Sequence, residues 1–426
     1  MCDKLQFEIR SGSDKMVSKK KLLLIVVITV LITAFTTYTF GNFALVKAGD
    51  KVLVSENDFN IMKTYTQKYN KFEKLINYAK ENFLYEADEE VMLEGALKGM
   101  LSALGDPYTE YMTQKEFNSL LEQTKGSYEG IGVYITPSDD NRIMVVSPIE
   151  DTPAEKAGLK TGDKIIKVNG TEYTADKMDD AIKIMKGMPN TSVTLTILRV
   201  DKDGKSQTFD VDVMRETIKL VTVKSSMLED NIGYIRITTF DEQTAADFKA
   251  QYKALEKQGM KGLVVDLRYN PGGIIDATVE ITDMLIGEGF VTYTQTKAGE
   301  REYYNSDKNK INIPYVLLVN EGSASASEIM AGAVKDTKSG TLIGTKTFGK
   351  GIVQRIQRFG SDGSGVKMTI SEYFTPSGVN IHGIGIEPDI ILELNEGTEG
   401  YGSEYFSTDN QLQKAVEVIK EKLINQ

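Results

Sequence analysis

The sequence predicts a multidomain α/β protein with one N-terminal transmembrane helix. Three observations predict this class: an apolar run at residues 22–40, a compact stretch of short strands at residues 127–215, and an alternation of strands with helices at residues 216–395. The chain has 426 residues, which is enough for two or three domains. Its composition, 41% hydrophobic and 26% charged, is that of an ordinary globular protein.

The apolar run at residues 22–40 follows three lysines, Lys19 to Lys21, and is close to the roughly 20 residues that span a bilayer. Lysines at this end favour a cytoplasmic N-terminus. We therefore expect residues 1–21 to form a short cytoplasmic tail, residues 22–40 to form a single-pass anchor in the cell membrane, and the catalytic part to be extracytoplasmic. A cleaved signal peptide is the competing interpretation, since Val46-Lys47-Ala48 before Gly49 resembles a cleavage site.

Residues 55–125 are predicted to form an N-terminal helical region. Apolar side chains recur at helical spacing within residues 65–85 and again within residues 91–105. Gly105-Asp106-Pro107 is expected to end the second helix. Packing within the chain is the expected use of these stripes, and a homodimer contact is the alternative.

The two following regions are predicted to differ in their secondary structure. Residues 127–215 carry short β-branched runs between turn residues, with two helical stretches, and predict a β-rich unit. Residues 216–395 alternate strands and helices, which is typical of a buried parallel sheet. Residues 396–426 are expected to form a tail that ends in an amphipathic helix.

Composition excludes several functions. The formal net charge of −11 argues against a nucleic-acid partner. Cys2 is the one cysteine and His382 the one histidine, so we expect no metal site, no cysteine nucleophile and no cofactor.

The stretch “GSASASE”, residues 322–328, follows an apolar strand and opens a predicted helix. A residue at such a junction lies near free helix N–H groups, which favour negative charge. Ser325 and Glu328 also match a capping box, so Ser325 is locally either a nucleophile or a plain helix cap.

Two further stretches carry groups suited to catalysis. In “TKTFGKGIVQ”, residues 345–354, a buried Lys350 could act as a general base, because desolvation disfavours the ammonium. Gln354 could orient the amine only if the chain turns or bulges near Gly351, because i and i+4 lie about 13 Å apart in a straight strand. In “DLRYNPGG”, residues 266–273, the glycines could expose N–H groups or simply form a turn.

Several stretches, in their order along the chain, resemble the carboxyl-terminal processing peptidases, also called tail-specific proteases. They are “LKGMLSALGDPYTEYM”, “TPAEKAGLKTGDKIIKVNG”, “DLRYNPGG”, “GSASASEI”, “GTKTFGKGIVQ” and “IHGIGIEPDI”. The resemblance covers residues 80 to 395. It implies a protease core of the crotonase and Clp-protease type, residues 216–395, with an inserted PDZ domain, residues 127–215.

The resemblance also implies the roles of individual residues. Ser325 would be the nucleophile of a Ser-Lys dyad, Lys350 its base, and Gln354 the residue that supports the lysine. The oxyanion hole would be the N–H of Ala326 with that of Gly272 or Gly273.

For the PDZ domain, the resemblance implies a loop, Gly130-Ile131-Gly132, that holds the terminal carboxylate of a peptide. Val133 would begin the edge strand that the peptide extends. The expected partners are therefore protein or peptide substrates with free C-termini.

Two other functions compete with a Ser-Lys endopeptidase. One is a Ser-His-Asp hydrolase that uses His382, in a stretch that reads as turn and strand. The other is a membrane-tethered PDZ scaffold with an inactive protease fold, which the presence of Ser325, Lys350 and Gln354 argues against.

Overall fold

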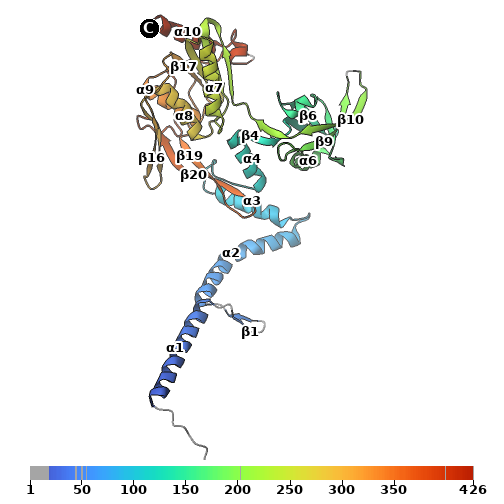
Figure 1. Cartoon of the computed structure of the whole chain (residues 1–426), viewed down its shortest axis with the longest axis vertical. Helices are drawn as coiled ribbons and strands as arrows, with labels where there is room; N and C mark the ends of the chain where they lie inside the picture. Colours follow the sequence, from blue (N-terminus) through green and yellow to red (C-terminus); the bar gives the residue numbers. More distant parts are fainter. Residues whose placement is uncertain are drawn as a thin grey trace, which may run out of the picture. The chain divides into compact units, whose positions relative to one another are not determined.

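The computed structural model describes residues 19–43, 46–48, 51–53, 55–201, 203–398 and 400–425 (Figure 1). The chain divides into two units, residues 1–96 and residues 97–426. Residues 1–18 of the cytoplasmic tail predicted at residues 1–21, and Gly49 of the alternative cleavage site, lie outside the described residues.

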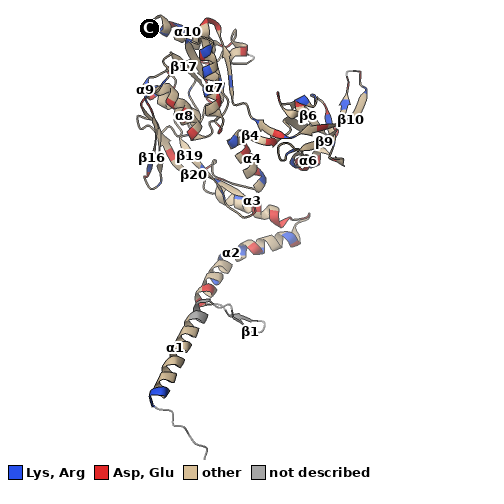
Figure 2. Cartoon of the chain, in the orientation of Figure 1, with Lys and Arg blue, Asp and Glu red and all other residues tan. Residues whose placement is uncertain are grey.

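The first unit begins with the predicted apolar helix, α1 (Lys19–Phe43). Residues Lys19–Tyr38 are long and apolar enough to cross a membrane, and none of that window is buried. In Figure 2 the described part of α1 has the colour of charged residues only at its start, where the lysines lie. A short hairpin follows, β1 (Val46–Ala48) and β2 (Lys51–Leu53), and then α2 (Glu56–Asn82).

The predicted helices of residues 55–125 form, as α2, α3 (Glu89–Ser102) and α4 (Gln114–Lys125). One strand was not predicted: Glu110–Met112 is β3, which pairs with a later strand, β20. Three residues are too few to show the alternation that identifies a strand, and these form one because they pair with β20.

The β-rich unit contains one sheet in the order β10-β9-β7-β6-β5, with β8 beside β7. Its interior holds buried aliphatic residues from the sheet and from the short helices α5 and α6, with Ile143, Ile165 and Leu195 at its centre. Strand β5 pairs with β6 alone and is therefore an edge strand, as the resemblance implied. The elements are β4 (Ser127–Gly130), β5 (Val133–Pro137), β6 (Ile143–Pro148), α5 (Pro153–Lys156), β7 (Lys164–Val168), β8 (Thr171–Glu172), α6 (Met178–Met185), β9 (Ser192–Val200), β10 (Ser206–Met214) and β11 (Glu216–Lys219), the last paired with β4.

The predicted parallel sheet is confirmed, in the order β12-β13-β14-β17-β18-β21, with only β12 antiparallel to its neighbour. Its strands and helices are β12 (Val223–Met227), β13 (Ile232–Ile237), α7 (Thr244–Lys257), β14 (Gly262–Asp266), α8 (Ile275–Ile286), β17 (Tyr315–Val319), α9 (Ala326–Thr337), β18 (Thr341–Gly344) and β21 (Ile390–Ile391).

Both faces of this sheet are covered, which explains why its central strands are apolar throughout. Leu317 faces the core formed with α7, α8 and α9, whereas its neighbour Val316 faces α10 (Asn410–Ile424) (Figure 1). The segment expected as a tail thus supplies one layer of the core. A buried Arg268 bonds Asp266 at the end of β14 (2.6 Å) and Asp409 at the start of α10 (2.8 Å), and so ties that layer to the sheet.

A second, antiparallel sheet was not predicted. It has the order β16-β15-β20-β19, with β3 also on β20. Its strands are rich in Thr, Gln, Arg and Tyr and are partly exposed, so they lack the alternation that identifies a half-buried strand. They are β15 (Gly289–Thr296), β16 (Arg301–Ser306), β19 (Ile352–Arg358) and β20 (Gly365–Phe374).

Candidate active site

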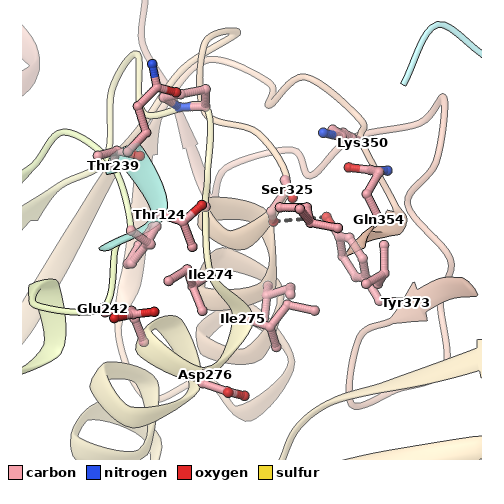
Figure 3. A pocket seen from close by; sticks show the side chains of 18 of the residues that line it. Thr124, Thr239, Glu242, Ile274, Ile275, Asp276, Ser325, Lys350, Gln354 and Tyr373 are labelled. Carbon is pink, nitrogen blue, oxygen red and sulfur yellow. Dashed lines mark hydrogen bonds between the residues drawn. The ribbon is translucent and has the colours of Figure 1, made fainter. Parts of the chain in front are cut away.

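Ser325 lies where the chain leaves β17 and enters α9, and its backbone is strained. It is the N-cap residue of α9, with φ 55° and ψ −114°. A residue other than glycine in this left-handed region costs on the order of 1–3 kcal/mol, and such strain concentrates at functional sites. The bonds around it hold the conformation: the Ser325 N–H donates to Glu328 Oε2 (2.9 Å), and Tyr373 Oη donates to the Ser325 carbonyl (3.0 Å) (Figure 3).

The three serines of the run have different environments. Ser323 is fully buried and donates to the Leu267 carbonyl (2.8 Å), and Ser327 is fully buried and donates to the Asn270 carbonyl (2.9 Å). Ser325 is only half-buried and lines a cavity of about 660 Å³. Of the three, Ser325 is therefore the one that an external substrate can reach.

Lys350 and Gln354 line the same cavity as Ser325. Figure 3 labels both side chains among those that line the cavity with Ser325. The orienting role required an irregularity near Gly351, and β19 has one, a register shift between Val353 and Gln354. Burial, followed by the charge of Lys367, lowers the pKa of Lys350 and so favours the neutral amine that a base requires.

Glu328 connects the segments that carry Ser325 and Lys350. Its carboxylate is fully buried and accepts four hydrogen bonds, from the N–H groups of Ser325 (2.9 Å), Gly349 (2.7 Å) and Lys350 (2.8 Å) and from Thr347 Oγ1 (2.6 Å). The sequence signal identified Glu328 only as half of a capping box. Its bonds to the lysine loop depend on tertiary structure and left no pattern in the sequence.

The backbone around Ser325 offers N–H groups for an oxyanion. Gly272 lies so close that an added Cβ would be 2.8 Å from the Ala326 nitrogen, so only glycine fits there. The Gly272 N–H donates to Asn270 Oδ1 (2.9 Å) and is already used. Among the described residues, the N–H groups of Ala326 and Gly273 have no acceptor, which makes them the better pair of those predicted.

The predicted carboxylate loop lines a cavity of its own, of about 200 Å³. Gly130, Ile131, Gly132 and Val133 form one wall. Ile135, Ile182 and Met185 give the cavity an apolar interior, and Glu122, Tyr128 and Lys186 complete its lining. Within the described part of the chain, the Ile131 and Gly132 N–H groups have no backbone acceptor, as a loop that binds a carboxylate requires.

His382 does not line the Ser325 cavity. It is exposed and lines a second cavity, of about 900 Å³, together with Asp106 and Tyr108. This placement gives no support to a Ser-His-Asp arrangement.

Comparison with known proteins agrees with this organisation. Three family models match: “Peptidase family S41” at residues 231–392, “PDZ domain” at residues 144–199, and “Activating protease CtpB N-terminal domain” at residues 30–116. The chain is 37% identical over 377 residues to the carboxy-terminal processing protease CtpA of Bacillus subtilis (strain 168), covering 88% of this chain and 77% of that one.

Two further relatives have the same kind of name. The carboxy-terminal-processing protease of Bartonella bacilliformis is 37% identical over 352 residues, covering 80% of this chain and 79% of that one. A solved structure, the photosystem II D1 C-terminal processing protease, is 32% identical, covers 76% of this chain and 86% of that one, and has a TM-score of 0.43. The chain belongs to the carboxy-terminal processing proteases of peptidase family S41, serine-type proteases with a PDZ domain.

Proposed function

We propose that the protein is a membrane-anchored endopeptidase that cleaves peptide bonds with a Ser325-Lys350 dyad. The observation that carries this proposal is the shared cavity: it is lined by an accessible serine on a strained helix N-cap, by a lysine of lowered pKa and by a glutamine. An inactive scaffold is not favoured, because the relatives are named as proteases.

The mechanism follows from these positions. Neutral Lys350 takes the proton of Ser325 Oγ as the oxygen attacks the scissile carbonyl carbon, and the N–H groups of Ala326 and Gly273 stabilise the oxyanion. When the intermediate collapses, the C–N bond breaks and the lysine returns the proton to the leaving amine. Water, deprotonated by the same lysine, then attacks the acyl carbon, the C–O bond to Ser325 breaks, and the lysine returns the proton to Ser325 Oγ. Gln354 orients the amine throughout.

The proposed fold and location extend the family assignment. We infer a core of the crotonase and Clp-protease type with an inserted PDZ domain, since β3, which precedes the PDZ domain, pairs with β20 of the protease sheet. The exposed apolar helix α1 supports a single-pass anchor with the catalytic part outside the cytoplasm, and the lysines at its start favour this orientation.

Covalent labelling tests the nucleophile. A phosphonofluoridate, which reacts with activated serines, is expected to modify Ser325 and neither Ser323 nor Ser327, as mapped by peptide mass spectrometry. The Lys350→Met variant is expected to react at least about 100-fold more slowly, since the base is absent. Labelling of another serine, or equal labelling rates in the two proteins, would reject the dyad.

Recognition of the C-terminus has a separate test. A peptide with a free, apolar C-terminus is expected to have a kcat/KM about 10-fold higher than the same peptide blocked as an amide, because the amide carries no charge for the loop N–H groups. A Met185→Asp variant, which places a negative charge in the apolar cavity and so repels the terminal carboxylate, is expected to abolish that preference. Equal rates for the two peptides in the wild-type protein would contradict the PDZ proposal and leave the dyad untouched.

A further inference from the structure

The Lys350 side chain lies against an aromatic ring contributed by a distant segment of the chain. Its Nζ is 4.5 Å from the centre of the Tyr108 ring. Among the described residues, Nζ makes no ion pair and has no hydrogen-bond acceptor. The face of the tyrosine ring is therefore the contact that the structure gives to the amine.

Tyr108 is held firmly in place by the residues around it. Asp106 accepts a bond from the Tyr108 N–H (3.0 Å) and another from Thr109 Oγ1 (2.6 Å). The buried Thr109 hydroxyl in turn accepts a bond from the Thr369 N–H of β20 (3.0 Å). These bonds attach the loop that contains Tyr108 to β20. Strand β20 pairs with β19, the strand that carries Gln354.

The contact stands between two cavities. Lys350 lines the Ser325 cavity, Tyr108 lines the cavity of about 900 Å³ that contains His382, and Ile352 lines both. The contact of Tyr108 with the amine therefore joins a residue that lines the second cavity to one that lines the Ser325 cavity.

We propose that Tyr108 is a positioning residue for Lys350: the face of its ring holds the amine at the Ser325 cavity and favours its charged form while the cleft is empty. The inference rests on the proposed dyad. An aromatic face attracts a cation through its quadrupole and has no comparable attraction for a neutral amine. The ring thus acts against burial, which favours the neutral amine, and Lys350 would leave it on losing its proton to act as a base.

The other charged groups around Lys350 are few. Lys367 of β20 repels the ammonium, whereas Asp106 of the loop and Glu328 of α9 attract it. His382 lies beside Asp106, on which its charge acts. None of these groups changes when the Tyr108 ring is replaced, so the contribution of the ring can be isolated.

Two variants at position 108 separate the effect of the aromatic face from the effect of side-chain bulk. Tyr108→Phe keeps the aromatic face, and Tyr108→Met keeps an apolar side chain of similar length without it. In Tyr108→Met we expect the acidic limb of kcat/KM against pH to move to lower pH by about half a unit, because the charged amine loses its stabilising face. We also expect kcat on the plateau to fall about 10-fold, with KM within about twofold, since the amine is less well placed. Tyr108→Phe should match the wild-type protein in all three quantities.

A spectroscopic measurement tests the same inference without an assay of enzyme activity. The full-length Ser325→Ala protein is labelled with [ε-¹³C]lysine, and the Lys350 signal is assigned by its loss in Lys350→Arg. The midpoint of its titration should lie about half a pH unit lower when Tyr108→Met is added. Tyr111→Met is the control: Tyr111 is a buried ring on the adjoining strand, so its loss should lower Tm and leave the Lys350 titration in place.

The outcomes separate this inference from the dyad. An unmoved acidic limb and titration in Tyr108→Met, or a Tyr108→Phe variant that behaves like Tyr108→Met, would overturn the role of the ring while the dyad stands. Wild-type hydrolysis in Lys350→Met would reject the dyad, and the lysine titration would still report whether the ring stabilises the ammonium.

Discussion

Replacing Ser325 by alanine, or Lys350 by methionine, is expected to lower kcat for a peptide substrate by about 10⁴-fold or more. Ser325 supplies the attacking oxygen and Lys350 removes its proton, so each variant keeps only substrate binding and the oxyanion donors. Because the two residues act as a unit, the double variant should be about as slow as either single variant. Steady-state hydrolysis of a quenched fluorescent peptide with a free, apolar C-terminus measures all three.

Ser327→Ala is the matched control, since the two serines lie two residues apart at the start of one helix. The Ser327 hydroxyl is buried and bonded to the Asn270 carbonyl, so its loss should cost about 1 kcal/mol of the free energy of unfolding and leave kcat near the wild-type value. Ser325→Ala should instead lose hydrolysis and leave Tm almost unchanged. An inactive Ser327→Ala beside an active Ser325→Ala would transfer the nucleophile role to Ser327.

The parallel sheet was predicted correctly because its central strands are buried on both faces. Strands such as β17 are apolar at every position because helices cover both faces of their sheet, and this leaves a strong signal. The second sheet was missed because strands such as β19 are mostly polar and partly exposed. Strand β3 was missed for another reason: three residues carry no period, and only pairing with β20 makes them a strand.

The candidate site shows the same division between local and tertiary signals. Ser325, Lys350 and Gln354 were predicted from motifs, and the structure brings them to one cavity. The aromatic contact of Tyr108 with Lys350 joins residues 242 positions apart (350 − 108), which no local pattern records. The choice between Gly272 and Gly273 for the oxyanion hole likewise depended on a bond from the Gly272 N–H to Asn270, visible only in the folded chain.

Glu328→Gln is expected to destabilise the protein and to slow it, although the two side chains have almost the same shape. Oε1 of Glu328 accepts bonds from Thr347 Oγ1 and the Gly349 N–H, and Oε2 accepts bonds from the Ser325 and Lys350 N–H groups. A glutamine offers one accepting oxygen, so its NH₂ group must meet donors at the other position. We expect a loss of about 2–4 kcal/mol in the free energy of unfolding, the cost of one or two buried donors without acceptors.

The effect on catalysis should come through the backbone. Since the carboxylate accepts from the N–H groups of both Ser325 and Lys350, its loss would let the two segments shift apart, and a displacement of about 1 Å can cost about 100-fold in rate. We therefore expect kcat to fall by about 10- to 100-fold, with KM much less affected. Chemical denaturation gives the stability, and peptide hydrolysis below the unfolding transition gives the rate.

Glu321→Gln is the control, because Glu321 precedes the same serine run but is exposed and, among the described residues, bonds only the Thr345 hydroxyl (3.0 Å). It should change the free energy of unfolding by less than about 0.5 kcal/mol and leave kcat unaltered. A Glu328→Gln variant with lowered stability and wild-type kcat would mean that the carboxylate supports the fold without aligning the dyad. Loss of both stability and kcat would instead make Glu328 the link through which α9 sets the position of the lysine loop.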